Sequence, residues 1–169
     1  MANVINVYTD GACKGNPGGY GGWGWAEFSN KTYIGKEIVF VDCGGCANST
    51  NNKMELEAVI EYLSDAVYGY HYKIHSDSQY VLKGLIKNMH GEILKKSGIY
   101  TGWLTGWIKK DYHDVKNSDY WMDLDKIIKI HLSKGSTLEF LHVSAHVGIY
   151  GNELADTLAN IGITNFKKK

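Results

Sequence analysis

The segment NVINVYTD at residues 3–10, with the glycine-rich GACKGNPGGYGGWG at residues 11–24 behind it, decides the fold of this chain. The first segment alternates and is rich in β-branched residues, which predicts a strand that ends at Asp10. The second contains the only proline of the chain and predicts a turn-rich connection. Two more strands are expected at residues 20–28 and 32–42, so the chain begins as a three-stranded meander.

Helical and strand patterns alternate after the meander. Residues 43–53 are polar and predict a loop, and residues 89–117 have no regular period. The remaining elements expected are a helix at 54–68, a strand at 71–77, helices at 78–88 and 119–132, a strand at 137–143 and a helix at 152–162. This βββ-α-β-α-α-β-α order predicts an α/β fold with a five-stranded mixed sheet flanked by helices. We expect a single domain over residues 1–169, with a frayed tail at 164–169.

Composition narrows the classes of function. With 44% apolar residues among 169, the chain can bury a core, which excludes a wholly disordered protein. Lys+Arg and Asp+Glu both total 18, so the net charge is zero and a protein that grips nucleic acid by bulk positive charge is excluded. All 18 cations are lysines. The chain has no long apolar run and no signal-peptide pattern, so we expect a cytoplasmic protein with no membrane association.

Three cysteines are too few for an extracellular disulfide framework. Cys43 and Cys46 form a lone CxxC pair. A tetrahedral zinc site of this type needs a second pair of ligands, so zinc is not expected.

Four acidic residues lie either at the end of a predicted strand or beside apolar or small residues on a predicted helix. Asp10 ends the first strand, and Asp77 ends the strand YKIHSD directly before a helix. Glu55 lies beside the apolar stripe of its helix, and Asp156 lies among small residues on the last helix. Each has a simple structural alternative: a turn residue for Asp10, helix caps for Glu55 and Asp77, and a solvated position for Asp156.

The four acids together favour a metal site. In α/β sheets the carboxyl ends of strands and the N-termini of helices meet at one edge, so these carboxylates are expected to converge. Carboxylates in close contact cannot all stay ionised without a cation. Oxygen ligands favour Mg²⁺ or Mn²⁺ over zinc. Two such ions about 3.5–4 Å apart are the known device for in-line displacement at a phosphodiester.

Four motifs resemble type 1 ribonuclease H in its bacterial or phage form. They are TDGACKGNPG around Asp10, STNNKMEL around Glu55, SDSQYV around Asp77 and HVGIYGNELAD at residues 146–156, in the order of the family. The resemblance spans about residues 4–161. It implies a ribonuclease H-like fold and an endonuclease that hydrolyses the RNA strand of RNA–DNA hybrids by two-metal-ion catalysis, leaving 5′-phosphate and 3′-hydroxyl ends.

The resemblance also implies a role for each residue of the site. Asp10, Glu55, Asp77 and Asp156 would be the catalytic ligands of two Mg²⁺ ions, with Mn²⁺ as a substitute. His146 matches the mobile histidine of the family, which assists proton transfer or product release.

The RNA–DNA hybrid would be recognised through ribose 2′-hydroxyls in its minor groove and through phosphates of the DNA strand. The residues implied in substrate binding are Gly11, Cys13, Asn16, Thr50, Asn51, Asn52, Gln79, Trp103, Trp107 and Asn117. Thr50 and Asn117 resemble the residues that hold a DNA phosphate, whereas a structural role for Cys13 stays open. The arginine that bacterial members usually have near the position of Asn48 is absent, which puts this phosphate pocket in doubt.

Residues 89–117 correspond to the basic protrusion of the family, and the stretch that contains them is longer here than in common bacterial members. We call residues 83–110 the lysine segment. It contains one acid, Glu92, and six lysines: Lys83, Lys87, Lys95, Lys96, Lys109 and Lys110. Trp103 and Trp107 add aromatic character, although tryptophans four residues apart also fit a core role.

Two other classes share parts of this pattern. A hybrid-binding module without catalysis would have lost an acid, and all four acids and His146 are present. Integrases, resolvases and exonucleases of related fold share the acidic first strand but not GNPG, TNNKMEL or the final motif. A stand-alone monomeric enzyme with no obligate protein partner is therefore expected.

Overall fold

The computed structural model describes residues 4–15, 17–29, 38–97 and 99–169. These residues form a mixed sheet of six strands in the order β3-β2-β1-β4-β6-β5. The strands are β1 (Val4–Lys14), β2 (Gly19–Ser29), β3 (Ile38–Ser49), β4 (His71–Ser76), β5 (Glu92–Ile93) and β6 (Thr137–His142). The β1–β2, β2–β3 and β5–β6 pairs are antiparallel, whereas β4 runs parallel to both β1 and β6.

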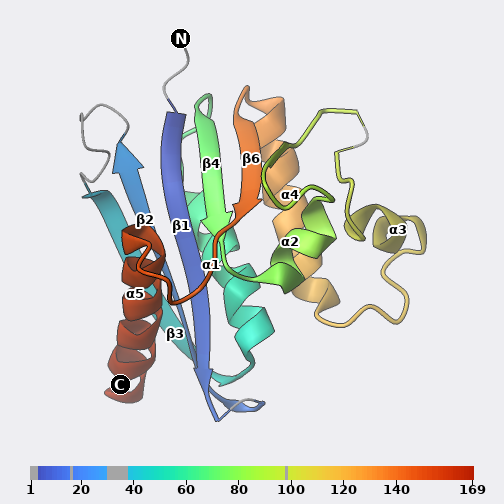
Figure 1. Cartoon of the computed structure of the whole chain (residues 1–169). Coiled ribbons are helices and arrows are strands. Elements are labelled where there is room, and N and C mark those ends of the chain that lie inside the picture. The colour runs from blue at the N-terminus through green and yellow to red at the C-terminus, as the bar shows by residue number, and fades with distance from the viewer. Residues whose placement is uncertain (1–3, 16, 30–37, 98) are drawn as a thin grey trace.

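Helices cover the two faces of the sheet unequally (Figure 1). They are α1 (Asn51–Asp65), α2 (Gln79–Leu85), α3 (Leu104–Lys109), α4 (Ser118–Ser133) and α5 (Tyr150–Lys167). Helix α5 crosses β1, β2 and β3 on one face, while α1 and α4 pack together behind the other. The main core lies on the α1 side, where Leu56, Val59, Ile74 and Trp121 are fully buried. None of the described helices is long and apolar enough to cross a membrane.

Backbone contact between α5 and the first hairpins sets the position of this helix. A Cβ atom at Gly22 would lie 2.1 Å from the carbonyl oxygen of Ala159, and one at Gly162 would lie 2.1 Å from that of Gly44. Only glycine allows the helix to approach β2 and β3 this closely. The glycine-rich sequence therefore places α5, and with it Asp156, directly on the sheet.

The sequence predicted the architecture correctly and several boundaries incorrectly. The expected loop at 43–53 is wrong, because β3 continues to Ser49 and α1 starts at Asn51. Pairing with β2, such as Cys43 with Gly24 and Cys46 with Gly21, outweighs the weak strand propensity of this stretch. Of the strand expected at 32–42, residues 32–37 lie outside the described residues.

The other differences are local. The first strand does not stop at Asp10 but pairs with β2 as far as Lys14. The expected five strands become six because the irregular stretch 89–117 contains the short β5, as well as α3. Most of the tail expected to fray is helical, since α5 continues to Lys167.

Candidate active site

Asp10 lies where the parallel part of the sheet ends. The last residue pair between β1 and β4 is Thr9 with Ser76, so Asp10 is one residue beyond that pairing, while its other side still pairs with Gly24 of β2. Its side chain is 5% exposed, and its Oδ1 accepts a hydrogen bond of 2.9 Å from the Gly11 N–H. Because the pairing of β1 with β4 stops at Thr9, a buried carboxylate lies at the carboxyl end of these parallel strands.

Glu55 reaches this edge because α1 lies against β1. A Cβ atom at Gly11 would stand 2.2 Å from the carbonyl carbon of Met54 and 2.3 Å from the nitrogen of Glu55. Glycine at position 11 therefore permits direct backbone contact between the strand and the helix. The Thr50 Oγ1 fixes the start of the helix by accepting a hydrogen bond from the Lys53 N–H.

Three carboxylates meet at this edge. Asp10, Glu55 and Asp77 each offer an oxygen, and these oxygens lie within 4.8 Å of one another. Oε2 of Glu55 is buried and has no hydrogen-bond partner among the described residues. Oδ2 of Asp77 accepts a hydrogen bond of 3.2 Å from Nδ2 of Asn152. A buried carboxylate oxygen without a donor is unfavourable unless a proton or a cation satisfies it.

The electrostatics of the cluster favour a cation. Burial raises the pKa of Asp10 to about 7, and the negative charges of Asp77 and Asp156 act in the same direction. Burial also raises the pKa of Glu55 well above its usual value, and the charge of Asp10 adds to the effect. A divalent cation among these oxygens would offset the repulsion, and an all-oxygen donor set suits Mg²⁺ or Mn²⁺. The residues present therefore fit a metal ion.

Asp156 and His146 border this cluster differently. Asp156 lies half-buried on α5, outside the 4.8 Å group but close enough for its charge to act on the pKa of Asp10. His146 is exposed on the connection between β6 and α5 and has a left-handed backbone with a φ of 57°. Gly148, two residues on, also has a positive φ, of 82°. The structure thus brings three predicted acids together, with the fourth beside them and the histidine on an exposed loop.

Several residues expected to contact substrate surround the start of α1. Asn51 and Asn52 are exposed in its first turn, directly after the capping Thr50. Cys13 has a structural contact, because its Sγ lies 3.4 Å from the carbonyl oxygen of Ser49 and donates to it. Asn16 lies outside the described residues.

The remaining expected substrate residues follow β4 in the chain, on α2, on or directly before α3, and before α4. Gln79 is exposed at the first residue of α2. Asn117 precedes α4 with a φ of 60°, and its Nδ2 donates to the Tyr80 hydroxyl at 3.0 Å. Trp103 is 55% exposed, whereas Trp107 is half-buried and packs edge-on against the buried Trp121. The two tryptophans therefore differ: Trp107 joins the core, and Trp103 offers a free face.

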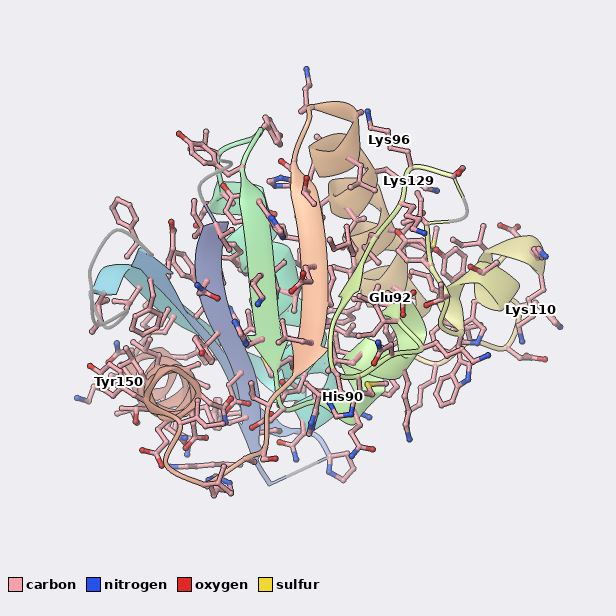
Figure 2. All side chains as sticks on the ribbon, turned by 45° about the horizontal axis from the view of Figure 1, so that its top comes forward. His90, Glu92, Lys96, Lys110, Lys129 and Tyr150 are labelled. Atoms are coloured by element: carbon pink, nitrogen blue, oxygen red, sulfur yellow. The ribbon has the colours of Figure 1, made fainter. Side chains whose placement is uncertain are left out.

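Glu92, the one acid among residues 83–110, joins two parts of this stretch. Oε2 of Glu92 accepts the N–H groups of Lys87 and Asn88, and Oε1 accepts the hydroxyl of Thr101. All six lysines are exposed. Figure 2 shows Lys110 beside α3 at the outer side of the molecule, whereas Lys96 lies near Lys129 at one end of α4. The zero net charge of the chain therefore includes a local excess of positive charge in residues 83–110, which contain six exposed lysines and one acid.

Sequence reasoning misses two residues of functional interest. By its position in the helical pattern Asn152 is only a neighbour of Asp156, yet its amide contacts Asp77. Glu92 is, by charge alone, a single acid among lysines, yet it organises the lysine segment. The motif HVGIYGNELAD contains a signal for Asn152, because residues four apart share one helix face and Asn152 therefore accompanies Asp156.

The arrangement defines a class of protein. An α/β fold that gathers buried carboxylates where the parallel strands of a mixed sheet end is suited to metal-dependent hydrolysis of phosphodiesters. Comparison with known proteins identifies the family within that class. The family model for RNase H matches residues 2–164. The chain belongs to the ribonuclease H family, whose members are endonucleases that hydrolyse the RNA of RNA–DNA hybrids.

Individual relatives are similar to this chain in sequence or in fold. A ribonuclease H from Albidiferax ferrireducens is 39% identical over 166 residues, which covers 95% of each chain. LC9-RNase H1, a type 1 RNase H with the type 2 active-site motif, has a TM-score of 0.74 at 21% identity and covers 98% of this chain and 74% of its own. LC11-RNase H1 in complex with RNA/DNA hybrid has a TM-score of 0.61 at 22% identity, with coverage of 96% and 98%. These structures support the ribonuclease H-like fold predicted from the sequence.

Proposed function

We propose that this enzyme cleaves the RNA strand of RNA–DNA hybrids with two Mg²⁺ ions, leaving 5′-phosphate and 3′-hydroxyl ends. The observation that carries the proposal is the cluster of Asp10, Glu55 and Asp77, with a buried Glu55 oxygen that has no partner among the described residues. Membership of the family supplies the substrate class. The oxygen-only donor set supplies the preference for Mg²⁺, with Mn²⁺ as a substitute.

Each acid has a part in this scheme. Asp10, Glu55 and Asp77 would hold the metal ions, with Asp156 as a further ligand from α5. Two bound ions would lower the pKa of the attacking water and stabilise the leaving 3′-oxygen. The protein contributes a pre-arranged cage: α1 and β1 fix two of the acids by backbone contact at Gly11.

His146 would move a proton during the reaction or during product release. Its exposed position on the connection between β6 and α5 gives it access to solvent and substrate. The positive φ of Gly148 marks a backbone position that glycine adopts more readily than other residues. An imidazole has one nitrogen that can donate a proton and one that can accept it, so this side chain is chemically suited to the task.

Recognition of the hybrid would combine two surfaces. Gly11, Thr50, Asn51 and Asn52 lie around the joint between β1 and α1, beside the acidic cluster. Cys13 on β1 and Gln79 at the start of α2 would extend this surface along the minor groove, where 2′-hydroxyls distinguish RNA from DNA. Asn16 lies outside the described residues and stays a candidate from the sequence alone. A similar fold is known in complex with RNA/DNA hybrid, that of LC11-RNase H1.

The DNA strand would meet Asn117, Trp103 and the lysine segment. A neutral protein with an acidic cluster needs a separate basic surface to attract a polyanion, and the six exposed lysines supply one. Trp107 would support Trp103, with the two ring centroids 6.1 Å apart, rather than bind substrate itself. We propose that the enzyme acts as a monomer in the cytoplasm.

A cleavage assay with strand-specific labels tests the proposal. Hybrid, duplex DNA and duplex RNA of one sequence are incubated with the enzyme in Mg²⁺ and, separately, in EDTA. The proposal expects cleavage of only the RNA strand of the hybrid, only with Mg²⁺, and products that carry 5′-phosphates. Cleavage of duplex DNA at a similar rate, or cleavage in EDTA, would contradict it.

A further inference from the structure

Asn152 is a buried amide beside the acidic cluster. Its side chain is 2% exposed and lies in the first turn of α5. Nδ2 donates a hydrogen bond of 3.2 Å to Oδ2 of Asp77, while Oδ1 is buried and has no partner among the described residues. An amide that satisfies a carboxylate with one end and presents a free acceptor with the other is unusual in a protein interior.

The surrounding packing fixes this amide. A Cβ atom at Gly151 would lie 2.3 Å from the ring of Tyr8, so the start of α5 rests directly on that ring. The Tyr8 ring is stacked on His75, with the ring centroids 4.3 Å apart and the planes 9° from parallel. His75 stands on β4, two residues before Asp77. The start of α5 and the end of β4 are therefore also linked through the Tyr8 ring, in addition to the Asn152–Asp77 hydrogen bond.

This contact links acids that come from different elements. Asp77 follows β4, whereas Asp156 lies one helical turn after Asn152 on α5. Apart from the Asn152 amide, the structure gives no other hydrogen bond to the Asp77 carboxylate among the described residues. Groups that orient metal ligands in this way contribute strongly to metal affinity.

We infer that Asn152 is a positioning residue: its Nδ2 holds the Asp77 carboxylate toward Asp10 and Glu55, the carboxylates that would hold the metal ion with it. The inference rests on the proposed metal-dependent function. An aspartate at position 152 would keep the shape of the side chain but, when ionised, would lose the donor and repel Asp77. An asparagine adds no charge to a cluster that already repels itself.

The alternative is a purely structural link between β4 and α5. In that case removal of the amide would lower stability without a specific effect on metal affinity or on turnover. Metal binding by the free enzyme separates these roles, because it requires neither substrate nor catalysis.

The experiment compares Asn152→Ala and the isosteric Asn152→Asp with wild type. Asn165→Ala serves as the matched control, because it removes an exposed amide from the same helix. Mn²⁺ binding to the metal-free enzyme is measured by titration calorimetry, kcat and KM are measured on hybrid in Mg²⁺, and circular dichroism reports folding.

The inference expects Asn152→Ala to weaken Mn²⁺ binding or lower kcat by about 10–100-fold, with KM for the hybrid little changed. Asn152→Asp should also lose kcat although it preserves packing, and Asn165→Ala should match wild type. Wild-type Mn²⁺ affinity and kcat in Asn152→Ala, full kcat in Asn152→Asp, or loss of folding in both variants would overturn it. Wild-type protein without Mg²⁺-dependent cleavage of the hybrid would instead refute the proposed function.

Discussion

Asp10→Asn should stabilise the metal-free protein at neutral and alkaline pH. In the folded chain the carboxyl of Asp10 is buried beside Glu55, Asp77 and Asp156, and burial raises its pKa to about 7. A carboxyl group whose pKa is raised by folding favours the folded state at low pH, and this contribution is lost as pH rises through the folded pKa. Asparagine keeps the acceptor for the Gly11 N–H but never carries the charge.

The size of the effect follows from the two pKa values. The pKa of Asp10 rises from 3.8 in the unfolded chain to about 7 in the folded chain. At about 1.36 kcal/mol for each pKa unit, ionisation of this carboxyl lowers the free energy of unfolding by about 4 kcal/mol. Glu55 is in contact with Asp10 and competes for the same proton, so neutralising one partner recovers part of this free energy. We expect the free energy of unfolding of Asp10→Asn to exceed that of wild type by about 2–4 kcal/mol at about pH 8, and by little at about pH 4.

Urea denaturation in EDTA at both pH values measures the difference. Asp123→Asn, which neutralises an exposed carboxylate on α4, is the control and should change stability by less than about 0.5 kcal/mol. Addition of Mg²⁺ should raise the stability of wild type toward that of the variant, because the cation neutralises the same cluster. Equal or lower stability of Asp10→Asn at pH 8 would refute the account of a self-repelling cluster.

Three functional predictions concern the rest of the site. His146→Ala should lower kcat by about 10²–10⁴-fold yet remain measurably active, since water can take over proton transfer; a loss as complete as that of Asp10→Asn would assign His146 to metal binding or folding. Replacement of Lys95, Lys96, Lys109 and Lys110 by alanine should raise KM with little change in kcat, and should make the slope of log Kobs against log[salt] shallower by about 0.7–0.9 for each phosphate that is no longer neutralised. An unchanged KM and slope would leave these lysines a role in solubility alone. A DNA duplex with one ribonucleotide should be cleaved far more slowly than a full hybrid, because the start of α1 would contact several sugars; equal rates would contradict recognition of several sugars.

The acidic cluster was predictable because its positions follow from general rules of α/β sheets. Asp10 and Asp77 stand at the ends of the pairing between β1 and β4, and strand ends of this kind share an edge. Glu55 was recognisable because it lies beside the apolar stripe of its helix. The contact of Asn152 with Asp77 was not predictable, because it joins residues 75 positions apart, although helical spacing does place Asn152 on the same helix face as Asp156.

The sequence did not predict that residues 43–49 belong to β3, and the physical reason differs from that for Asn152. Residues 43–49 contain glycines and small polar side chains, which predict a loop when taken alone. In the folded chain a Cβ atom at Gly44 would lie 2.5 Å from the Trp23 ring, and one at Gly45 would lie 2.6 Å from the carbonyl oxygen of Gly162 on α5. Pairing with β2 supplies the hydrogen bonds of the strand. Tertiary contact therefore selects both the composition and the strand, against local propensity.

The most direct test separates catalysis from binding at the acidic cluster. Single-turnover cleavage of a labelled RNA–DNA hybrid is measured in Mg²⁺ for wild type and Asp10→Asn, beside the Kd of each protein for the same hybrid. The account predicts rapid cleavage by wild type, no measurable cleavage by Asp10→Asn, and a Kd for the variant that is equal to or lower than that of wild type, because removal of one charge reduces repulsion of the phosphates. Substantial cleavage by Asp10→Asn would mean that Asp10 has only a structural role in the strand and its turn, and would contradict the proposed metal site.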